Sequence, residues 1–191
     1  MPRWEVGSEE RLKKATMELF AEQGVEATSV VEIAKRAGVT TRTFFRYFPD
    51  KRDVLFADAE SLLEALVGRI LEADVSRPFP AVIEVLAGFD WSAMGWQSQR
   101  WRHAIIAANP ELHERDLMKR DAIASAFTGA LRQRGVEAGT AQLASRVGSQ
   151  VFFTAYEKWL TAEDETSLAS VIEATLECFD ALVAIRSAYS T

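Results

Sequence analysis

The sequence predicts an all-α protein of about nine helices, because apolar residues recur at helical spacing along nearly the whole chain. The chain has 191 residues and is 48% hydrophobic, which allows a substantial core and argues against global disorder. The alternating pattern of a half-buried strand is absent from the sequence, as are internal repeats and low-complexity tracts. Glycine and proline residues divide the helical pattern into segments.

The first predicted helix has an amphipathic stripe made of Leu12, Ala15, Leu19 and Phe20. Gly24 ends this helix. A second, short helix begins at residue 28 or 29, because Ser29 and Glu32 have the spacing of a capping box. It stops at Gly38, and its apolar face consists of Val30, Ile33, Ala34 and Ala37.

A third short helix and a long fourth helix follow. Thr40 is the predicted N-cap of the third helix, and Pro49 closes it. Asp50 is the predicted cap of the fourth helix, which is expected to run toward Ser76 as one element.

The first three helices have the layout of a helix-turn-helix unit, whose last helix presents polar side chains to the major groove of DNA. Gly38 gives the turn a residue that is free to adopt a positive φ. Phe44 and Phe48 lie four residues apart and are expected to anchor the third helix inward. Arg42 and Arg46, also four apart, are expected to face outward. A small helical hairpin within a larger bundle is the alternative interpretation of this spacing.

The net charge of the chain is −6, but its basic residues concentrate around the predicted turn. Residues 28–52 contain six basic and two acidic side chains, a net charge of +4. The rest of the chain contains 16 basic and 26 acidic residues, a net charge of −10. Such a patch is compatible with a polyanion such as double-stranded DNA, since phosphate contacts are short-range and screened by salt. An ordinary solvated helix face explains the charges equally well.

The segment "SRPFP", residues 76–80, is the clearest break in the chain. Beyond it, helices are predicted near residues 80–93, 95–108, 110–134, 140–161 and 166–188. We therefore expect a helix-turn-helix domain over residues 1–50, a connecting helix over 51–76, and a second helical domain over 77–191.

Residues 11–55 resemble the N-terminal domain of the TetR family of transcriptional regulators. The resemblance rests on the Leu-Phe pair of the first helix, the Gly24 stop, the segment "TSVVEIAKRAGV", the aromatic-rich third helix and the Pro-x-Lys sequence that opens the fourth. It implies a DNA-binding homodimeric repressor that a small ligand, bound in the C-terminal domain, releases from its operator.

The resemblance also assigns DNA contacts to Thr28, Thr41, Arg42, Thr43, Phe45, Arg46, Tyr47 and Lys51. Thr28 and Lys51 are expected to hold phosphates at helix starts. Arg42, between two threonines, is expected to face base edges, since arginine can bind guanine through two hydrogen bonds; a phosphate contact is the alternative. Phe45 stands where the family usually has tyrosine, so only an apolar contact is expected of it. Arg46 and Tyr47 are expected to reach the DNA backbone or nearby bases.

The last two predicted helices carry apolar residues on two faces, which indicates two sets of neighbours. In the first of them the stripes are Leu143, Val147 and Val151, and Ala144, Gly148, Phe152, Ala155 and Trp159. In the second they are Leu168, Val171, Ile172, Phe179, Leu182 and Val183, and Ala174, Cys178, Ala181, Ile185 and Ala188. One neighbour is the protein's own core, and the resemblance favours a second subunit as the other, although central burial in a monomer fits too. A homodimer would require a near-palindromic operator, because its recognition helices would lie about 34–36 Å apart.

Aromatic residues concentrate in the C-terminal part. The predicted ligand-binding residues are Trp91, Trp96, Trp101, Arg102, His103, Phe152, Phe153, Tyr156 and Trp159. Such a concentration suits an apolar pocket, with Arg102 and His103 placed to meet an anionic end; an aromatic core with surface arginines is the alternative. The segment "RHAIIAANPELHERD" resembles family members with an acyl-CoA-like ligand-binding domain, which implies a small hydrophobic or acyl-type effector.

The sequence does not predict an enzyme, a metal site or a cofactor. The two histidines, His103 and His113, lack the spacing of metal ligands, and Gly-rich phosphate loops and Cys-His dyads are absent from the sequence. The lone Cys178 is expected to be an inert core thiol, and a cytoplasmic location is expected. The alternative is a helical small-molecule-binding protein or enzyme whose basic patch binds another anion.

Overall fold

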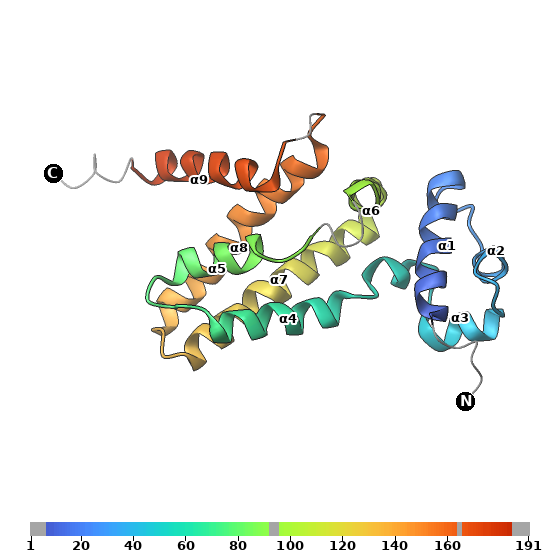
Figure 1. Ribbon diagram of the computed structural model, residues 1–191, viewed down its shortest axis with the longest axis horizontal. Coiled ribbons are helices and arrows are strands. Elements are labelled where there is room, and N and C mark those ends of the chain that lie inside the picture. The colour runs from blue at the N-terminus through green and yellow to red at the C-terminus, as the bar shows by residue number, and fades with distance from the viewer. Residues whose placement is uncertain (1–6, 92–95, 164–165, 185–191) are drawn as a thin grey trace. The chain divides into compact units, whose positions relative to one another are not determined.

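The computed structural model describes residues 7–91, 96–163 and 166–184, and it confirms the all-α prediction (Figure 1). The elements are α1 (Ser8–Gln23), α2 (Val30–Arg36), α3 (Thr41–Tyr47), the 3-10 helix η1 (Lys51–Phe56), α4 (Ala59–Glu72), α5 (Pro78–Ala87), α6 (Trp96–Ala108), α7 (Pro110–Gln133), α8 (Ala138–Thr161) and α9 (Leu168–Ala184). Residues 185–188, which the sequence assigned to the last helix, lie outside the described ranges. Within those ranges, every helix is too short or too polar to cross a bilayer.

The chain divides into two compact units, each built from two separate stretches. The first unit comprises Met1–Glu60 and Met94–Asp116, and the second comprises Ser61–Ala93 and Leu117–Thr191. Residues 94–116, which contain α6, therefore belong to the same unit as α1, α2 and α3. The domain boundaries expected after residues 50 and 76 stay a prediction.

The core of the first unit joins α1, α2, α3 and η1 in one apolar cluster. Its buried members are Leu12, Ala15, Leu19, Ile33, Ala37, Phe44, Phe48 and Val54. Phe20 lies in an adjacent cluster with Leu55, Phe56, Ile106 and Leu112, which brings in α6 and the start of α7. The stripe predicted for the first helix is thus confirmed as core, and each large side chain in it contributes about 1.5–3 kcal/mol by its burial.

The predicted continuous helix over residues 51–76 is wrong. Asp50 is a cap, as predicted, and forms a capping box with Asp53, but the element it starts is η1, and α4 begins only at Ala59. Val54, Leu55 and Phe56 are all buried. Val54 packs in the cluster with Phe44, whereas Leu55 and Phe56 pack in the cluster with Phe20, so tertiary contacts on two sides favour a turn here over a continuous helix.

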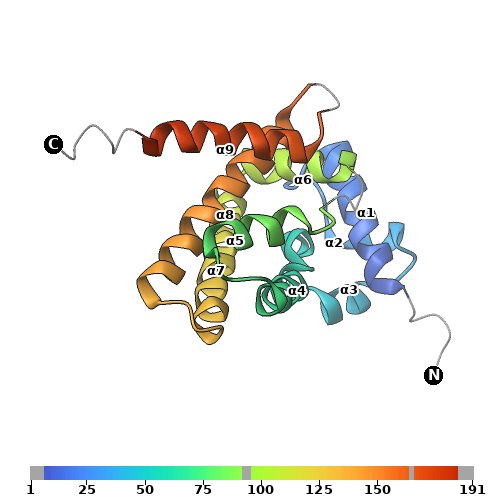
Figure 2. The ribbon, with the colours of Figure 1, turned by 60° about the vertical axis from the view of Figure 1, so that its left-hand side comes forward.

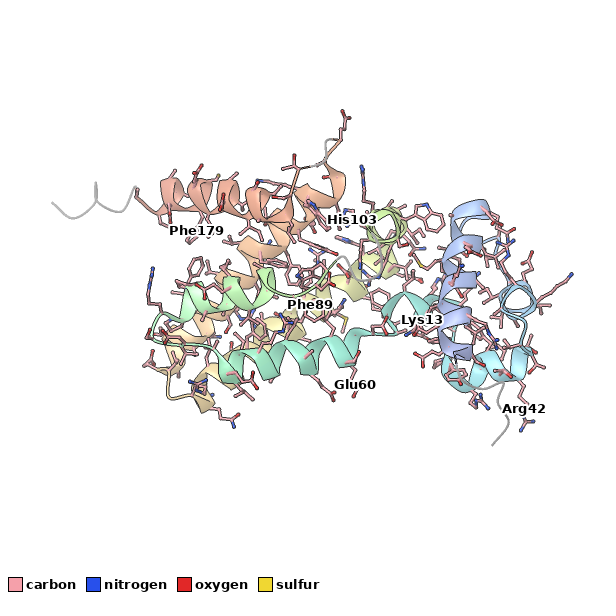
Figure 3. All side chains as sticks on the ribbon, viewed as in Figure 1. Lys13, Arg42, Glu60, Phe89, His103 and Phe179 are labelled. Atoms are coloured by element: carbon pink, nitrogen blue, oxygen red, sulfur yellow. The ribbon has the colours of Figure 1, made fainter. Side chains whose placement is uncertain are left out.

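Lys13 of α1 is bound to the segment between η1 and α4 (Figure 3). Its Nζ lies 2.7 Å from Oδ1 of Asp58 and 3.0 Å from the carboxylates of Glu9 and Glu10. Burial by itself lowers the pKa of Lys13, but the hydrogen bonds to Asp58 and to the two glutamates outweigh it and raise the pKa above its usual range. The three carboxylates therefore keep this amine charged.

In the second unit, α8 packs against both α5 and α9 (Figure 2). At Gly148 the approach to α5 is so close that a Cβ atom would lie 2.8 Å from Cγ1 of Val82, so a larger residue would force Val82 to move. The rings of Phe79 and Phe179 stack with centroids 5.4 Å apart and join α5 to α9. Cys178 is exposed, so the prediction that it is a core thiol is wrong. Thr175, one turn earlier on α9, is buried instead.

Candidate nucleic-acid interface

Local sequence signals define α2 and the turn that follows it. The side chain of Ser29 accepts a hydrogen bond from the backbone N–H of Glu32, and Glu32 accepts one from the backbone N–H of Ser29, which completes the predicted capping box. Gly38 has φ +68°, the left-handed conformation that glycine adopts without a steric penalty. Thr40 accepts a hydrogen bond from the backbone N–H of Thr43 and is the N-cap of α3, as predicted.

Helix α3 divides its side chains between core and surface. Phe44 is 0% exposed and Phe48 is 4% exposed, and their ring centroids lie 5.6 Å apart. The predicted inward anchors are therefore confirmed. On the other side of the helix, Arg42, Phe45 and Arg46 are exposed, and Phe45 keeps 57% of its surface in contact with solvent.

Arg42 projects from α3 away from the neighbouring helices (Figure 3). Within the part of the chain that the structure describes, its guanidinium makes no hydrogen bond or ion pair. Arg46, in contrast, lies with its guanidinium 4.9 Å from the centre of the Tyr47 ring and donates a hydrogen bond to the Tyr47 hydroxyl at 3.2 Å. Thr41, Thr43 and Tyr47 are half-buried at the edge of this face.

Two residues predicted to hold phosphates point into the unit. Thr28 is 1% exposed, and its hydroxyl lies 2.7 Å from the carbonyl oxygen of Gly24 and 3.3 Å from that of Leu19. The ammonium of Lys51 donates to the carbonyl oxygens of Val25 and Thr28. A phosphate contact from either side chain would have to replace these internal bonds, so both assignments stay predictions.

Two of the six basic residues counted over residues 28–52 have acidic partners outside that range. Arg36 lies 2.6 Å from Oε1 of Glu22, and Arg52 lies 2.7 Å from Oε1 of Glu26. The hydrogen bond from Arg36 lowers the pKa of Glu22. Both glutamates precede residue 28, so a window that begins there counts the arginines without the carboxylates that neutralise them. Glu22 lies 14 positions from Arg36, a separation that no local motif reports.

The predicted ligand-binding residues are divided between the two units. Five aromatic residues of the second unit lie together and are each at most 9% exposed; they are Trp91, Phe152, Phe153, Tyr156 and Trp159. The ring centroids of Trp91 and Tyr156 are 5.1 Å apart, and the indole N–H of Trp91 donates to the carbonyl oxygen of Leu86 at 2.6 Å.

The other predicted ligand-binding residues, Trp101, Arg102 and His103, belong to the first unit. Arg102 donates from Nε to the carbonyl oxygen of Leu55 at 2.8 Å, and its guanidinium lies 5.4 Å from the ring centre of Phe56. It therefore packs η1 against α6. The side chain of Trp96 lies outside the described residues. No cluster of three or more metal-ligating side chains occurs among the residues that the structure describes.

The α2–turn–α3 arrangement, with a buried inner face and an outer face that carries arginine and phenylalanine, defines a helix-turn-helix protein. Residues 12–57 match the family described as "Bacterial regulatory proteins, tetR family". Together with the relatives described next, this match makes the helix-turn-helix part of the chain similar to that of TetR-family regulators.

Two relatives carry the names of transcriptional regulators. The uncharacterised HTH-type transcriptional regulator YvdT of Bacillus subtilis is 34% identical over 37% of this chain and 36% of its own length. The HTH-type transcriptional regulator AcrR of Shigella flexneri is 44% identical over 34% of this chain and 29% of its own length. The chain thus matches about a third of these relatives.

A solved structure extends the similarity of the fold beyond the helix-turn-helix. The structure of Thermus thermophilus FadR, a TetR-family transcriptional repressor in complex with lauroyl-CoA, is 25% identical to this chain with a TM-score of 0.55. The match covers 88% of this chain and 91% of that one.

Proposed function

We propose that the protein is a cytoplasmic, ligand-responsive transcriptional regulator that binds a palindromic DNA operator as a homodimer and represses transcription. The observation that carries this proposal is the outer face of α3. Arg42 and Phe45 are held there in solvent by the buried anchors Phe44 and Phe48. An exposed arginine beside an exposed phenylalanine suits base readout, since arginine binds guanine edges and an aromatic ring can contact a thymine methyl group.

The homodimer is supported by apolar surface on α8 and α9. Leu143 of α8 is 66% exposed, and Leu182 and Val183 of α9 are 66% and 43% exposed. Large apolar side chains that are exposed on a monomer are candidates for a protein interface. Two copies of these helices would form a four-helix bundle and bury the exposed leucines.

The effector is proposed to be a small hydrophobic or acyl-type molecule. T. thermophilus FadR, which is similar over most of its length, has lauroyl-CoA bound. The five clustered aromatic residues of the second unit are the side chains best suited to surround an apolar chain. Binding that favours one separation of the two recognition helices would shift the dimer between DNA-competent and DNA-incompetent forms.

The experiment that tests the function is a binding-site selection from random duplex DNA at near-physiological salt. The expected product is a palindromic motif whose half-sites are about one helical turn, or a multiple of it, apart. A selection with no enriched sequence, both with and without fatty acids or acyl-CoA added, would contradict the proposal. It would favour a helical ligand-binding protein whose basic patch meets a different anion.

A further inference from the structure

Lys51 has its side chain in a cage of backbone carbonyl groups. Its Nζ lies 2.7 Å from the carbonyl oxygen of Val25, 2.8 Å from that of Thr28 and 3.4 Å from that of Glu26. A lysine ammonium has three N–H donors, so three converging carbonyl oxygens use all of them. All three acceptors come from the loop between α1 and α2, more than 20 positions earlier in the chain.

The loop that Lys51 holds determines where α2 begins. Thr28 directly precedes Ser29, the N-cap of α2. The hydroxyl of Thr28 bonds back to the carbonyl oxygen of Gly24, and Gln23 donates from Nε2 to the carbonyl oxygen of Ala27 at 3.3 Å. Carbonyl groups in a short loop lack the partners that a helix would give them, and an ammonium satisfies several at once.

We propose that Lys51 is a positioning residue. Its ammonium fixes the loop over residues 25–28, and with it the capped start of α2, instead of binding a DNA phosphate. The first half of this proposal concerns the protein alone; the second half rests on the DNA-binding function proposed above.

The chemistry of lysine and arginine separates the two roles. An ammonium is compact and directs three donors around one nitrogen, which fits a carbonyl cage. A guanidinium is larger and planar, so it cannot occupy the same cage, yet it binds phosphate at least as well. Lys51→Arg therefore preserves a phosphate contact and disrupts the cage, whereas Lys51→Met removes both.

The first measurement is amide hydrogen exchange of the full chain without DNA. In Lys51→Met and in Lys51→Arg, the segment over residues 24–33 is expected to exchange about ten-fold faster or more, because hydrogen bonds to a charged group are lost. Amides in the middle of α8 should keep their rates. Lys35→Met is the matched control: Lys35 is exposed on α2, so the variant removes one charge from the basic patch and leaves the cage intact.

The second measurement is the salt dependence of binding to the selected operator. Loss of a phosphate contact lowers the slope of log Kobs against log salt concentration by roughly 0.9 per contact. If Lys51 is a positioning residue, both variants bind DNA more weakly and keep the wild-type slope. If it binds phosphate, Lys51→Arg behaves as wild type and Lys51→Met has the smaller slope.

Unchanged exchange of residues 24–33 in both variants would overturn the proposal, as would wild-type operator affinity in Lys51→Arg. Should Lys51→Met not fold, Lys51→Arg decides alone, since it keeps the charge. If the wild-type protein selects no DNA sequence, the proposed function fails, but the exchange measurement still decides whether Lys51 holds the loop.

Discussion

Phe44 and Phe45 are neighbours in α3 with opposite environments. Their ring centroids lie 5.5 Å apart in an edge-to-face arrangement, but Phe44 is 0% exposed and Phe45 is 57% exposed. Since exposing a phenylalanine forgoes about 1.5–3 kcal/mol of burial, the position of Phe45 favours a contact that this chain alone does not make. At this scale the helix period distinguishes the buried anchor Phe44 from the exposed Phe45, and the sequence was sufficient to separate these two environments.

Arg42 gives the most direct prediction for single residues. Arg42→Ala is expected to weaken operator binding by about 1–3 kcal/mol and to relax the preference at one base pair of each half-site, because a base-reading guanidinium is lost. A binding-site selection with the variant measures this. Lys35→Ala is the control, because Lys35 is an exposed cation on α2. This variant is expected to leave the base preference of each half-site unchanged. Equal weakening on all sequences by Arg42→Ala would show a phosphate contact instead.

Ser145 and Ser149 give a prediction about stability. They lie one turn apart in α8, 0% and 3% exposed, and within the described part of the chain their hydroxyls have no hydrogen-bond partner. Because an unpaired buried hydroxyl costs free energy, Ser145→Ala is expected to leave the free energy of unfolding unchanged or raise it by about 1 kcal/mol. Urea unfolding at fixed protein concentration measures the change.

The control for this prediction is Thr175→Val in α9. Its buried hydroxyl donates to the carbonyl oxygen of Val171 at 2.8 Å, so this variant is expected to lose about 1 kcal/mol. A loss of that size in Ser145→Ala would mean that the Ser145 hydroxyl has a partner, such as a buried water molecule.

At the scale of elements, the start of α2 depends on two reciprocal hydrogen bonds. Ser29→Ala removes the cap and is expected to cost about 1 kcal/mol of stability at pH 7. Hydrogen bonds from the Ser29 side chain and backbone lower the pKa of Glu32. A lowered folded-state pKa contributes stability that is present above the unfolded pKa of about 4.3 and is lost as the pH falls through the folded pKa.

The variant should therefore differ most from wild type at neutral pH, and the difference should shrink below about pH 4. Urea midpoints of both proteins at pH 7 and pH 3 measure this. A difference that is equal at both values would show that the Ser29 hydroxyl does not stabilise the ionised Glu32.

The capping signals show which elements the sequence could predict. Ser29, Gly38, Thr40 and Asp50 act within three or four residues of themselves, so a local pattern is enough to locate them. The 3-10 helix was missed because three consecutive buried residues, Val54 to Phe56, look the same in sequence as the interior of a long helix. The internal hydrogen bonds of Thr28 and Lys51 were missed because their partners are backbone carbonyls, which carry no sequence signal.

At the scale of the whole molecule, the predicted ligand-binding residues also show that a local sequence pattern predicts some contacts and misses others. The aromatic residues of α8 share a helix face, so their clustering could be predicted from spacing. Arg102 and His103 follow Trp91 closely in sequence, yet they belong to the other compact unit, because the chain passes from the second unit back into the first between residues 93 and 94. The short sequence separation between Trp91 and Arg102 therefore did not predict that these residues belong to different units.

The proposed homodimer is tested at Leu182. Leu182→Glu places a charge on exposed apolar surface of α9, so it is expected to produce a monomer at micromolar concentration and to abolish operator binding while the helical content is retained. Sedimentation measures the oligomeric state. Val31→Glu is the control, since Val31 is 64% exposed on α2 in the first unit and should leave the dimer intact. A Leu182→Glu protein that still sediments as a dimer would exclude this face of α9 from the interface.

The split composition of the first unit constrains how its DNA specificity can be moved to another regulator. A hybrid that fuses residues 1–60 to a foreign C-terminal part would discard Ile106 and Leu112, which pack with Phe20 and Phe56. It would also discard Arg102, which binds the backbone of η1. A hybrid in which the first unit keeps its structure therefore has to include two segments of this chain, residues 1–60 and 94–116.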